Sequence, residues 1–216
     1  MKTHLRLCTV LALLLLAVMT VSPAAAQTLY ENGPINGETD GWTINFGFAV
    51  ADSFTISTGS STVTGLSFGA WVSPGDVIES VEVSVTQIPF GGTEYFDGVV
   101  NLTQSGCFLN NFSFDICTET GTFNGPTLNN GTYWLTLQNA VTADGNPAYW
   151  DENSGIGCHS PGCPSEGDNG SLGSLPSEAF TVLGTPGTGS TPEPGSLLLF
   201  GGGLVASLGF ARRRFQ

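Results

Sequence analysis

Basic side chains are missing from the whole middle of this 216-residue sequence, and their absence limits how the chain can fold. No Lys or Arg occurs between Arg6 and Arg212, whereas all 18 Asp and Glu residues lie in that interval. A domain built from it has no Lys or Arg salt bridges, so its fold must rest on apolar burial, hydrogen bonds and cross-links. Its negative charge would also repel phosphate backbones, which excludes nucleic acid as a partner.

The interval between the two ends shows the two-residue alternation of β-strands. Val81, Val83 and Val85 are separated by polar residues, as in a strand with one buried face. The same alternation marks three further segments, at residues 66–70, 112–116 and 133–137. Turn-forming Gly, Pro, Asn and Asp residues separate these segments. The pattern predicts an all-β fold over residues 27–183, an antiparallel β-sandwich with jelly-roll-like architecture.

The N-terminal segment has the three parts of a secretory signal. Lys2 and Arg6 precede an apolar run at residues 7–21, and Ala24 and Ala26 supply the small side chains before a cleavage site. We expect residues 1–26 to be a signal peptide that signal peptidase removes after Ala26. The alternative is an uncleaved membrane anchor, for which the apolar run is short.

The C-terminal segment is a second candidate signal. A Gly/Thr/Pro linker at residues 184–191 leads to Pro192, Glu193 and Pro194, which favour an extended backbone. An apolar stretch at residues 196–211 follows and predicts a transmembrane helix in the inner membrane, short for a full span. Three arginines end the stretch and would mark its cytoplasmic side: Arg212, Arg213 and Arg214.

The order of Pro-Glu-Pro, apolar segment and Arg cluster resembles the PEP-CTERM sorting signal of Gram-negative bacteria that make exopolysaccharide. The resemblance covers residues 191–215, and the segment is also catalogued as an "ice-binding protein C-terminal domain". It implies that an exosortase recognises this signal, residues 192–216, and removes it during export, cutting at a bond near Pro194 that the sequence does not define. It also implies that the domain reaches the cell surface or extracellular matrix, with exopolysaccharide as a candidate partner. An ordinary tail anchor is the alternative. The body has only isolated T-x-T triplets, so no ice-facing array is predicted.

The cysteines fit an exported domain. Removal of the signal peptide leaves four of them: Cys107, Cys117, Cys158 and Cys163. Short separations favour a Cys107–Cys117 disulfide across a predicted hairpin and a Cys158–Cys163 disulfide in a loop. A zinc site that adds His159 is the weaker alternative, because the cysteine spacings are poor for metal ligation.

Two tryptophans are candidates for carbohydrate contact. If Tyr133 faces the core, Trp134 points outward, where its ring could stack on a sugar, and Trp150 does the same if Tyr149 is buried. The alternative is that both tryptophans fill the core.

Acidic residues could bind calcium, the one cofactor the sequence suggests. Asp144, Asp151 and Glu152 are the main candidates, and Glu94 with Asp97 forms a further pair. None has a diagnostic calcium-loop spacing, and a solvated acidic surface that keeps a secreted protein soluble is the favoured interpretation.

No catalytic arrangement stands out in the sequence. Asp151 and Glu152 are adjacent, so on a strand they point to opposite faces and cannot form a glycosidase pair. We therefore expect a non-enzymatic exported protein with a structural or adhesive role. A carbohydrate-binding module is the alternative, and a secreted hydrolase is a weaker one.

Overall fold

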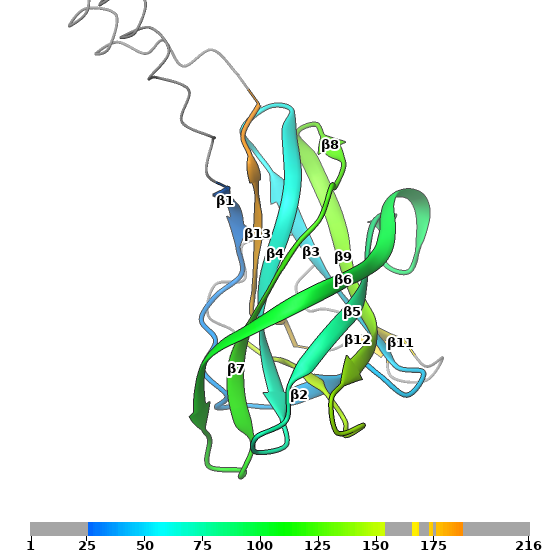
Figure 1. The fold of residues 1–216 in the computed structure, drawn as a ribbon. Helices are drawn as coiled ribbons and strands as arrows, with labels where there is room; N and C mark the ends of the chain where they lie inside the picture. The colour runs from blue at the N-terminus through cyan, green and yellow to red at the C-terminus, as the bar shows by residue number, and fades with distance from the viewer. Residues whose placement is uncertain (1–25, 154–165, 169–172, 175, 188–216) are drawn as a thin grey trace, which may run out of the picture.

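The computed structural model describes residues 26–153, 166–168, 173–174 and 176–187 (Figure 1). Residues 1–25 of the predicted signal peptide, the predicted sorting segment from residue 192, and Cys158, His159 and Cys163 lie outside these residues. Within the described part, no helix is long and apolar enough to cross a membrane. The predicted helix at residues 196–211 is outside that part.

The described residues form β-strands that pair antiparallel throughout. In chain order the strands are β1 (Gln27–Glu31), β2 (Gly41–Thr43), β3 (Ala49–Ile56), β4 (Ser61–Val72), β5 (Ile78–Ile88), β6 (Gly91–Leu109), β7 (Asp115–Thr122), β8 (Thr127–Leu128), β9 (Gly131–Thr142), β10 (Tyr149–Asp151), β11 (Glu166–Asp168), β12 (Gly173–Ser174) and β13 (Phe180–Thr185). The predicted all-β antiparallel fold is confirmed. β13 also includes the first two residues of the predicted linker.

The strands follow one hydrogen-bonded path, in the order β1-β13-β4-β7-β6-β5-β9-β3-β11-β12, with β2, β8 and β10 off this path. The long strand β6 serves both halves of the sheet: its first part pairs with β5 and its second part with β7. Figure 1 shows β6 crossing diagonally between the halves. In place of the two separate sheets of a jelly-roll-like sandwich, the structure therefore has a single, strongly curled sheet.

The core lies on the inner side of the curled sheet. Val81, Val83 and Val85 of β5 are buried, and Leu135 and Leu137 of β9 join them. The alternation read from the sequence is confirmed in both strands. The other face of these strands carries polar side chains, among them Ser84 and Thr136.

A buried polar cluster links β1, near one end of the path, to β3, near the other. Asn32, which directly follows β1, donates from Nδ2 to Asp52 Oδ2 of β3 at 2.9 Å. The Ser177 hydroxyl and the Glu178 backbone N–H also donate to Asp52 Oδ2, each at 2.8 Å. Hydrogen bonds between these groups therefore tie together parts of the curled sheet that strand pairing does not join.

The turn between β6 and β7 differs from the predicted strand at residues 112–116. Asn110 accepts backbone N–H bonds at Oδ1 from Phe112 and Phe114, so the chain reverses there and β7 begins only at Asp115. The Phe112 ring stacks on Trp71 at 5.6 Å. The alternation of Phe112 and Phe114 thus belongs to a turn that packs its rings against β4.

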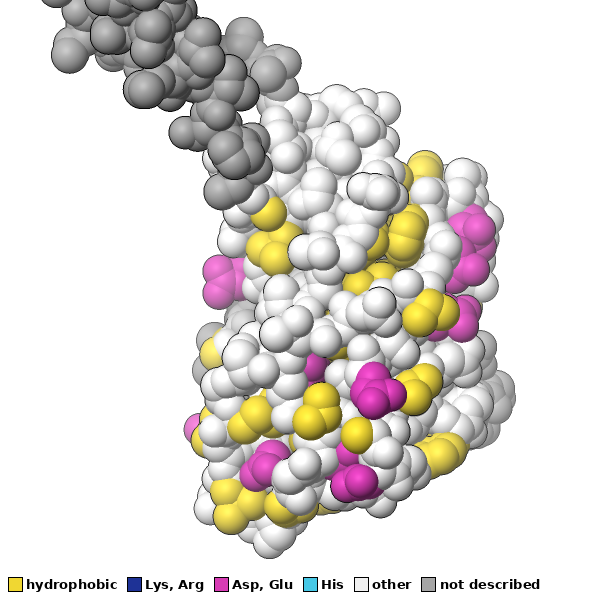
Figure 2. Space-filling model, in the orientation of Figure 1, with side chains coloured by type: hydrophobic (Ala, Val, Ile, Leu, Met, Phe, Trp, Pro, Cys, Tyr) yellow, Lys and Arg dark blue, Asp and Glu magenta, His cyan; other side chains and the backbone are white. Residues whose placement is uncertain are grey.

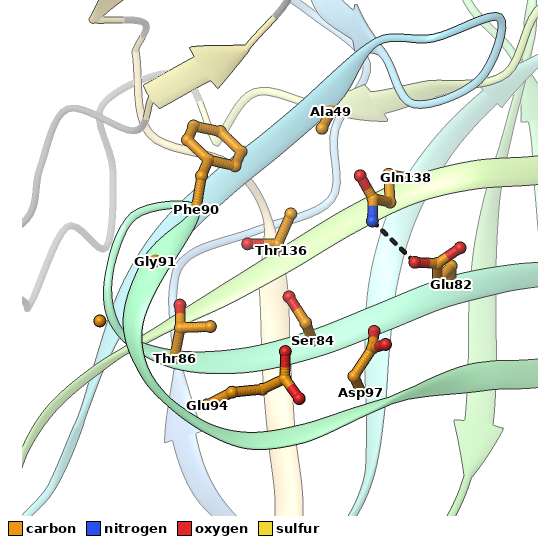
Figure 3. Close-up of a pocket in the computed structure, with 11 residues that line it drawn as sticks. Ala49, Glu82, Ser84, Thr86, Phe90, Gly91, Glu94, Asp97, Thr136 and Gln138 are labelled. Carbon is orange, nitrogen blue, oxygen red and sulfur yellow. Dashed lines mark hydrogen bonds between the residues drawn. The ribbon is translucent and has the colours of Figure 1, made fainter.

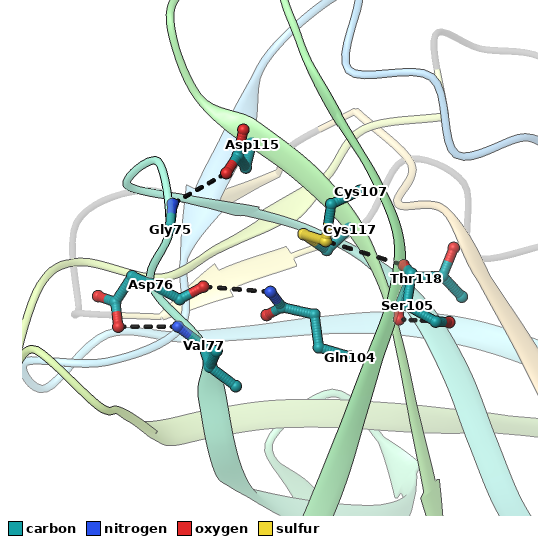
Figure 4. Close-up of a disulfide and its surroundings, with 9 residues drawn as sticks. All are labelled: Gly75, Asp76, Val77, Gln104, Ser105, Cys107, Asp115, Cys117 and Thr118. Atoms are coloured by element: carbon teal, nitrogen blue, oxygen red, sulfur yellow. Dashed lines mark hydrogen bonds between the residues drawn. A yellow bond between two sulfur atoms is a disulfide. The ribbon is translucent and has the colours of Figure 1, made fainter.

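The predicted disulfide between Cys107 and Cys117 is confirmed and joins β6 to β7 across this turn (Figure 4). Replacing Cys107 by Ser and Cys117 by Ala is expected to lower the free energy of unfolding by about 2 to 3 kcal/mol, because the cross-link restricts the unfolded chain. Denaturant unfolding with and without reductant measures the effect. Reductant should lower the unfolding free energy of the parent protein more than that of the variant. Any response that remains in the variant reports on the other cysteines. Equal stability of parent and variant would contradict the prediction.

Candidate functional site

The outward face of β5 and β9 is polar where their inner face is apolar. Leu135 and Leu137 enter the core, so Thr136 between them points outward. Ser84 of β5 lies opposite Thr136 on one side and opposite Asp97 of β6 on the other. A row of carboxylate and hydroxyl groups thus crosses three strands.

A β-bulge in β6 adds a second carboxylate to this face. Val85 pairs with Phe96, but the next residue of β5 pairs with Glu94, which leaves Tyr95 as the extra residue. Glu94 and Asp97 are three positions apart and would point to opposite faces of a regular strand. The extra residue reverses this, and Figure 3 shows both carboxylates on the same side of the sheet, beside Ser84.

These side chains line an open hollow of about 340 Å³. Phe90, at the tip of the β5–β6 hairpin, borders it and has a left-handed backbone with φ of 54°. Ligand pockets in proteins start at roughly 300 Å³, so the hollow has room for a small ligand. The lining residues are Ala49, Glu82, Ser84, Thr86, Phe90, Gly91, Gly92, Glu94, Asp97, Thr136 and Gln138.

The hydrogen-bonding capacity of the hollow is only partly used. Glu82 accepts hydrogen bonds from Gln138 Nε2 and Asn139 Nδ2, each at 2.8 Å. Thr136 is 2% exposed, and its hydroxyl has no hydrogen-bond partner within the described part of the chain. A buried hydroxyl without a partner costs on the order of 1 to 3 kcal/mol. A ligand that offers a polar group to Thr136 would recover part of that cost.

Trp134 lies on the same face, two residues before Thr136 on β9. Its side chain is half-buried and sits between two cross-strand neighbours, Thr86 of β5 and Ser53 of β3. The predicted outward orientation of Trp134 is confirmed, because Tyr133 is buried on the core side. Trp134 does not line the hollow itself, but it lies on the same face of the sheet, next to the lining residue Thr86.

Trp150, the other predicted carbohydrate contact, is in the core. Its side chain is 0% exposed, and its indole Nε1 donates to the Ala179 carbonyl at 3.1 Å. Strand β10 pairs with β2 on one side and with β4 on the other. The prediction that Trp150 meets a sugar is thus wrong, because neighbouring elements cover the indole completely.

The predicted calcium ligands Asp151 and Glu152 are used by the protein itself. Asp151 accepts from Trp71 Nε1 at 2.5 Å and from the Asn36 backbone N–H at 3.0 Å. Glu152 accepts from Trp42 Nε1 at 2.6 Å. Burial raises the pKa of both carboxyls, and these N–H donors offset part of the increase.

Asp144, the third predicted calcium ligand, lies in an exposed turn after β9. Its backbone N–H donates to Asp76 Oδ1 at 3.1 Å, and Asn146 Nδ2 donates to Asp76 Oδ2 at 3.0 Å. Within the described ranges, no three His, Cys, Asp or Glu side chains are grouped so that they could hold a metal ion. The three predicted ligands therefore do not assemble into a calcium site there.

The sequence did not single out Thr136, Ser84 or Glu82 as site residues. Their outward orientation is readable from the alternation in β5 and β9. That these two strands are neighbours is not, because more than forty residues separate Ser84 from Thr136 along the chain. Glu94 and Asp97 form an acidic pair in the sequence, but no sequence signal indicates the bulge that turns both to one face.

A protein-family comparison matches residues 190–214 to the PEP-CTERM protein-sorting motif. The chain carries a PEP-CTERM sorting motif. The resemblance read from Pro192, Glu193, Pro194 and the terminal arginines is thereby confirmed. The motif implies export, association with the cell envelope and processing by an exosortase. Comparisons with curated proteins and with solved structures gave no match.

Proposed function

We propose that this chain is an exported, non-enzymatic surface protein whose β domain adheres to polysaccharide in the cell envelope or the surrounding matrix. The PEP-CTERM motif supplies the export and the envelope association. One observation carries the adhesive role: an outward hollow lined by Thr136, whose hydroxyl lacks a partner among the described residues, on the face that also holds the half-buried Trp134.

Before processing, the precursor would stay briefly in the inner membrane of a Gram-negative cell with its domain in the periplasm. In this proposal signal peptidase cuts after Ala26, and residues 196–211 hold the precursor until an exosortase acts at Pro192, Glu193 and Pro194. The positively charged end of the apolar segment would remain on the cytoplasmic side. The domain is then released to the cell surface.

The chemistry of the hollow suits a sugar ring. Sugar hydroxyls donate to carboxylates and exchange hydrogen bonds with hydroxyl groups, both of which line the hollow. The apolar face of a pyranose can lie on the Trp134 indole. A shallow, open site of this kind favours binding to a long polymer at many positions, as adhesion requires.

The positions of the strongly buried acids support a non-enzymatic role. A glycosidase needs one carboxyl held protonated beside the scissile bond. Asp52 and Glu119 have pKa values raised by burial, but Asp52 holds the cluster near β1 and Glu119 faces the core. Neither lines the hollow.

Sugar binding is testable with the exported full chain, purified in detergent and probed first on a glycan array that includes the producing cell's exopolysaccharide. Trp134→Ala is expected to weaken binding about five- to tenfold through the lost ring contact. Thr136→Val should weaken it about three- to tenfold. Calorimetry on the best array ligand measures both effects.

Two matched variants serve as controls for this experiment. Trp134→Phe keeps an aromatic face and should retain most of the affinity. Thr132→Val changes an exposed residue earlier in β9, outside the hollow, and should bind like the parent. A blank array, or equal binding by Trp134→Ala and parent, would refute the adhesive proposal.

A further inference from the structure

The hollow carries charge of only one sign. Glu82, Glu94 and Asp97 line it, and the described residues contain no Lys or Arg that could neutralise them. Figure 2 shows acidic side chains on the visible face and no basic ones. A ligand of negative charge would therefore be repelled, and one of positive charge would be attracted.

The three carboxylates are not equivalent. Glu82 is held by Gln138 and Asn139. Glu94 and Asp97 have no hydrogen-bond or ion-pair partner among the described residues. The bulge in β6 is what places these two free carboxylates on one wall of the hollow. Bulges that redirect a side chain in this way are frequent at functional sites.

A second, independent feature lies across the sheet from the free carboxylates. Thr136 of β9, whose buried hydroxyl is also unpaired among the described residues, lines the same hollow, with Ser84 of β5 between it and Asp97. The site thus offers an anionic wall and an unpaired neutral hydroxyl. A ligand that satisfies both must carry a positive charge and a hydroxyl group on one small framework.

We propose that the hollow binds an amino sugar with a free ammonium group, as found in a de-N-acetylated polysaccharide. This inference rests on the proposed function and names its ligand class. The ammonium group donates to Glu94 and Asp97, and a ring hydroxyl meets Thr136. An N-acetylated sugar presents a neutral amide at the same place and leaves both carboxylates without a counter-charge.

Calcium is the competing cation for two free carboxylates. Calcium takes six to eight oxygen ligands, several of them usually carboxylates. No three acidic side chains of the described residues are grouped as a metal site requires. The hollow, at about 340 Å³, is also far larger than a single ion needs. The geometry therefore favours an ammonium group on a larger ligand.

The direct experiment compares three probes on the exported full chain by calorimetry: glucosamine oligomers, N-acetylglucosamine oligomers of equal length, and calcium chloride alone. Titrations at pH 6 keep the glucosamine amines charged. Glucosamine oligomers are expected to bind at least about tenfold more tightly than the acetylated ones. Raising the salt concentration from 0.05 M to 0.5 M should weaken the binding of the glucosamine oligomers several-fold. Calcium alone should give no saturable heat.

Variants of Glu94 and Asp97 test whether these two carboxylates bind the ammonium group. Glu94→Gln with Asp97→Asn should reduce the affinity for glucosamine oligomers about tenfold and leave any affinity for neutral oligomers unchanged. The matched control, Glu79→Gln with Asp144→Asn, removes the same charge from exposed positions outside the hollow and should stay within about twofold of the parent. Thr136→Val should weaken both kinds of oligomer.

The outcomes separate this inference from the proposed function. Equal affinity for acetylated and free oligomers, with Trp134→Ala still weaker, would overturn the amino-sugar inference and leave the adhesive role in place. The amino-sugar inference would also be overturned if calcium bound saturably and the double variant Glu94→Gln with Asp97→Asn abolished that binding. No binding of any oligosaccharide would overturn both.

Discussion

Trp150→Ala is expected to lower the free energy of unfolding by about 3 to 5 kcal/mol, a large part of the stability of an ordinary domain. The indole is 0% exposed, and its ring lies edge-on to Phe68 at 6.2 Å and to Phe180 at 5.4 Å. Truncation leaves a large cavity where β10 meets β4, and it also removes the donor to the Ala179 carbonyl. Denaturant unfolding followed by circular dichroism measures the change.

Trp134→Ala is the matched comparison, because Trp134 is half-buried and does not belong to the main apolar cluster. We expect it to cost less than about 2 kcal/mol of unfolding free energy while it weakens sugar binding. Trp150→Ala should cost more unfolding free energy and should leave sugar binding unchanged as long as the protein stays folded. Comparable losses of stability in both variants would contradict the assignment of one tryptophan to the core and the other to the site.

The domain is expected to lose stability as the pH rises from about 4.5 to 7.5, because two core carboxyls are easier to bury when protonated. Burial raises the pKa of Asp52 from 3.8 to about 6, with four hydrogen-bond donors offsetting part of the effect. Burial also raises the pKa of Glu119 from 4.5 to about 7. Neither oxygen of Glu119 has a hydrogen-bond partner among the described residues.

The sign follows from proton binding in the two states. Between the ordinary and the raised pKa, the folded protein keeps a proton that the unfolded chain has lost, so a higher pH favours unfolding. The stabilisation is complete below about pH 4 and is lost as the pH passes 6 for Asp52 and 7 for Glu119. Each group contributes on the order of 3 kcal/mol across its interval.

Unfolding free energies measured in urea at intervals between pH 4 and 8 test this prediction. Glu119→Gln should remove the upper part of the slope and make the protein more stable at pH 8, since the amide stays neutral. Asp52→Asn should remove the lower part. Asp144→Asn, at an exposed position, should leave the profile unchanged. A stability that increases with pH over this range would show that both carboxyls are buried in their charged form.

Most local patterns were read correctly from the sequence, although the alternation at residues 112–116 belongs largely to a turn. The alternation in β5 and β9 depends on residues that are direct neighbours along one strand, and the structure confirms it at Val81, Val83 and Val85. The Cys107–Cys117 disulfide closes a short hairpin, and the sorting motif is a contiguous segment. Each of these features is encoded over a short stretch of chain, so tertiary packing has little opportunity to change it.

Features that depend on distant segments were not predictable in the same way. The burial of Trp150 depends on Phe68 of β4 and Phe180 of β13, whose rings pack against the indole from distant parts of the chain. The alternation around Tyr149 could not supply that information. The sheet is curled and continuous because β6 is long enough to pair with β5 in its first part and with β7 in its second part.

The sequence alone determined that this protein carries a PEP-CTERM signal, which implies export, and that its body is β-rich without Lys or Arg, because composition and short motifs carry that information. Only the tertiary structure decided where a ligand could bind. The hollow requires Thr136 of β9 beside Ser84 of β5, and a bulge that turns Glu94 to the side of Asp97. The register of neighbouring strands sets both the pairing of Thr136 with Ser84 and the position of the bulge. Register is a property of a pair of strands, so no single segment of the sequence contains it.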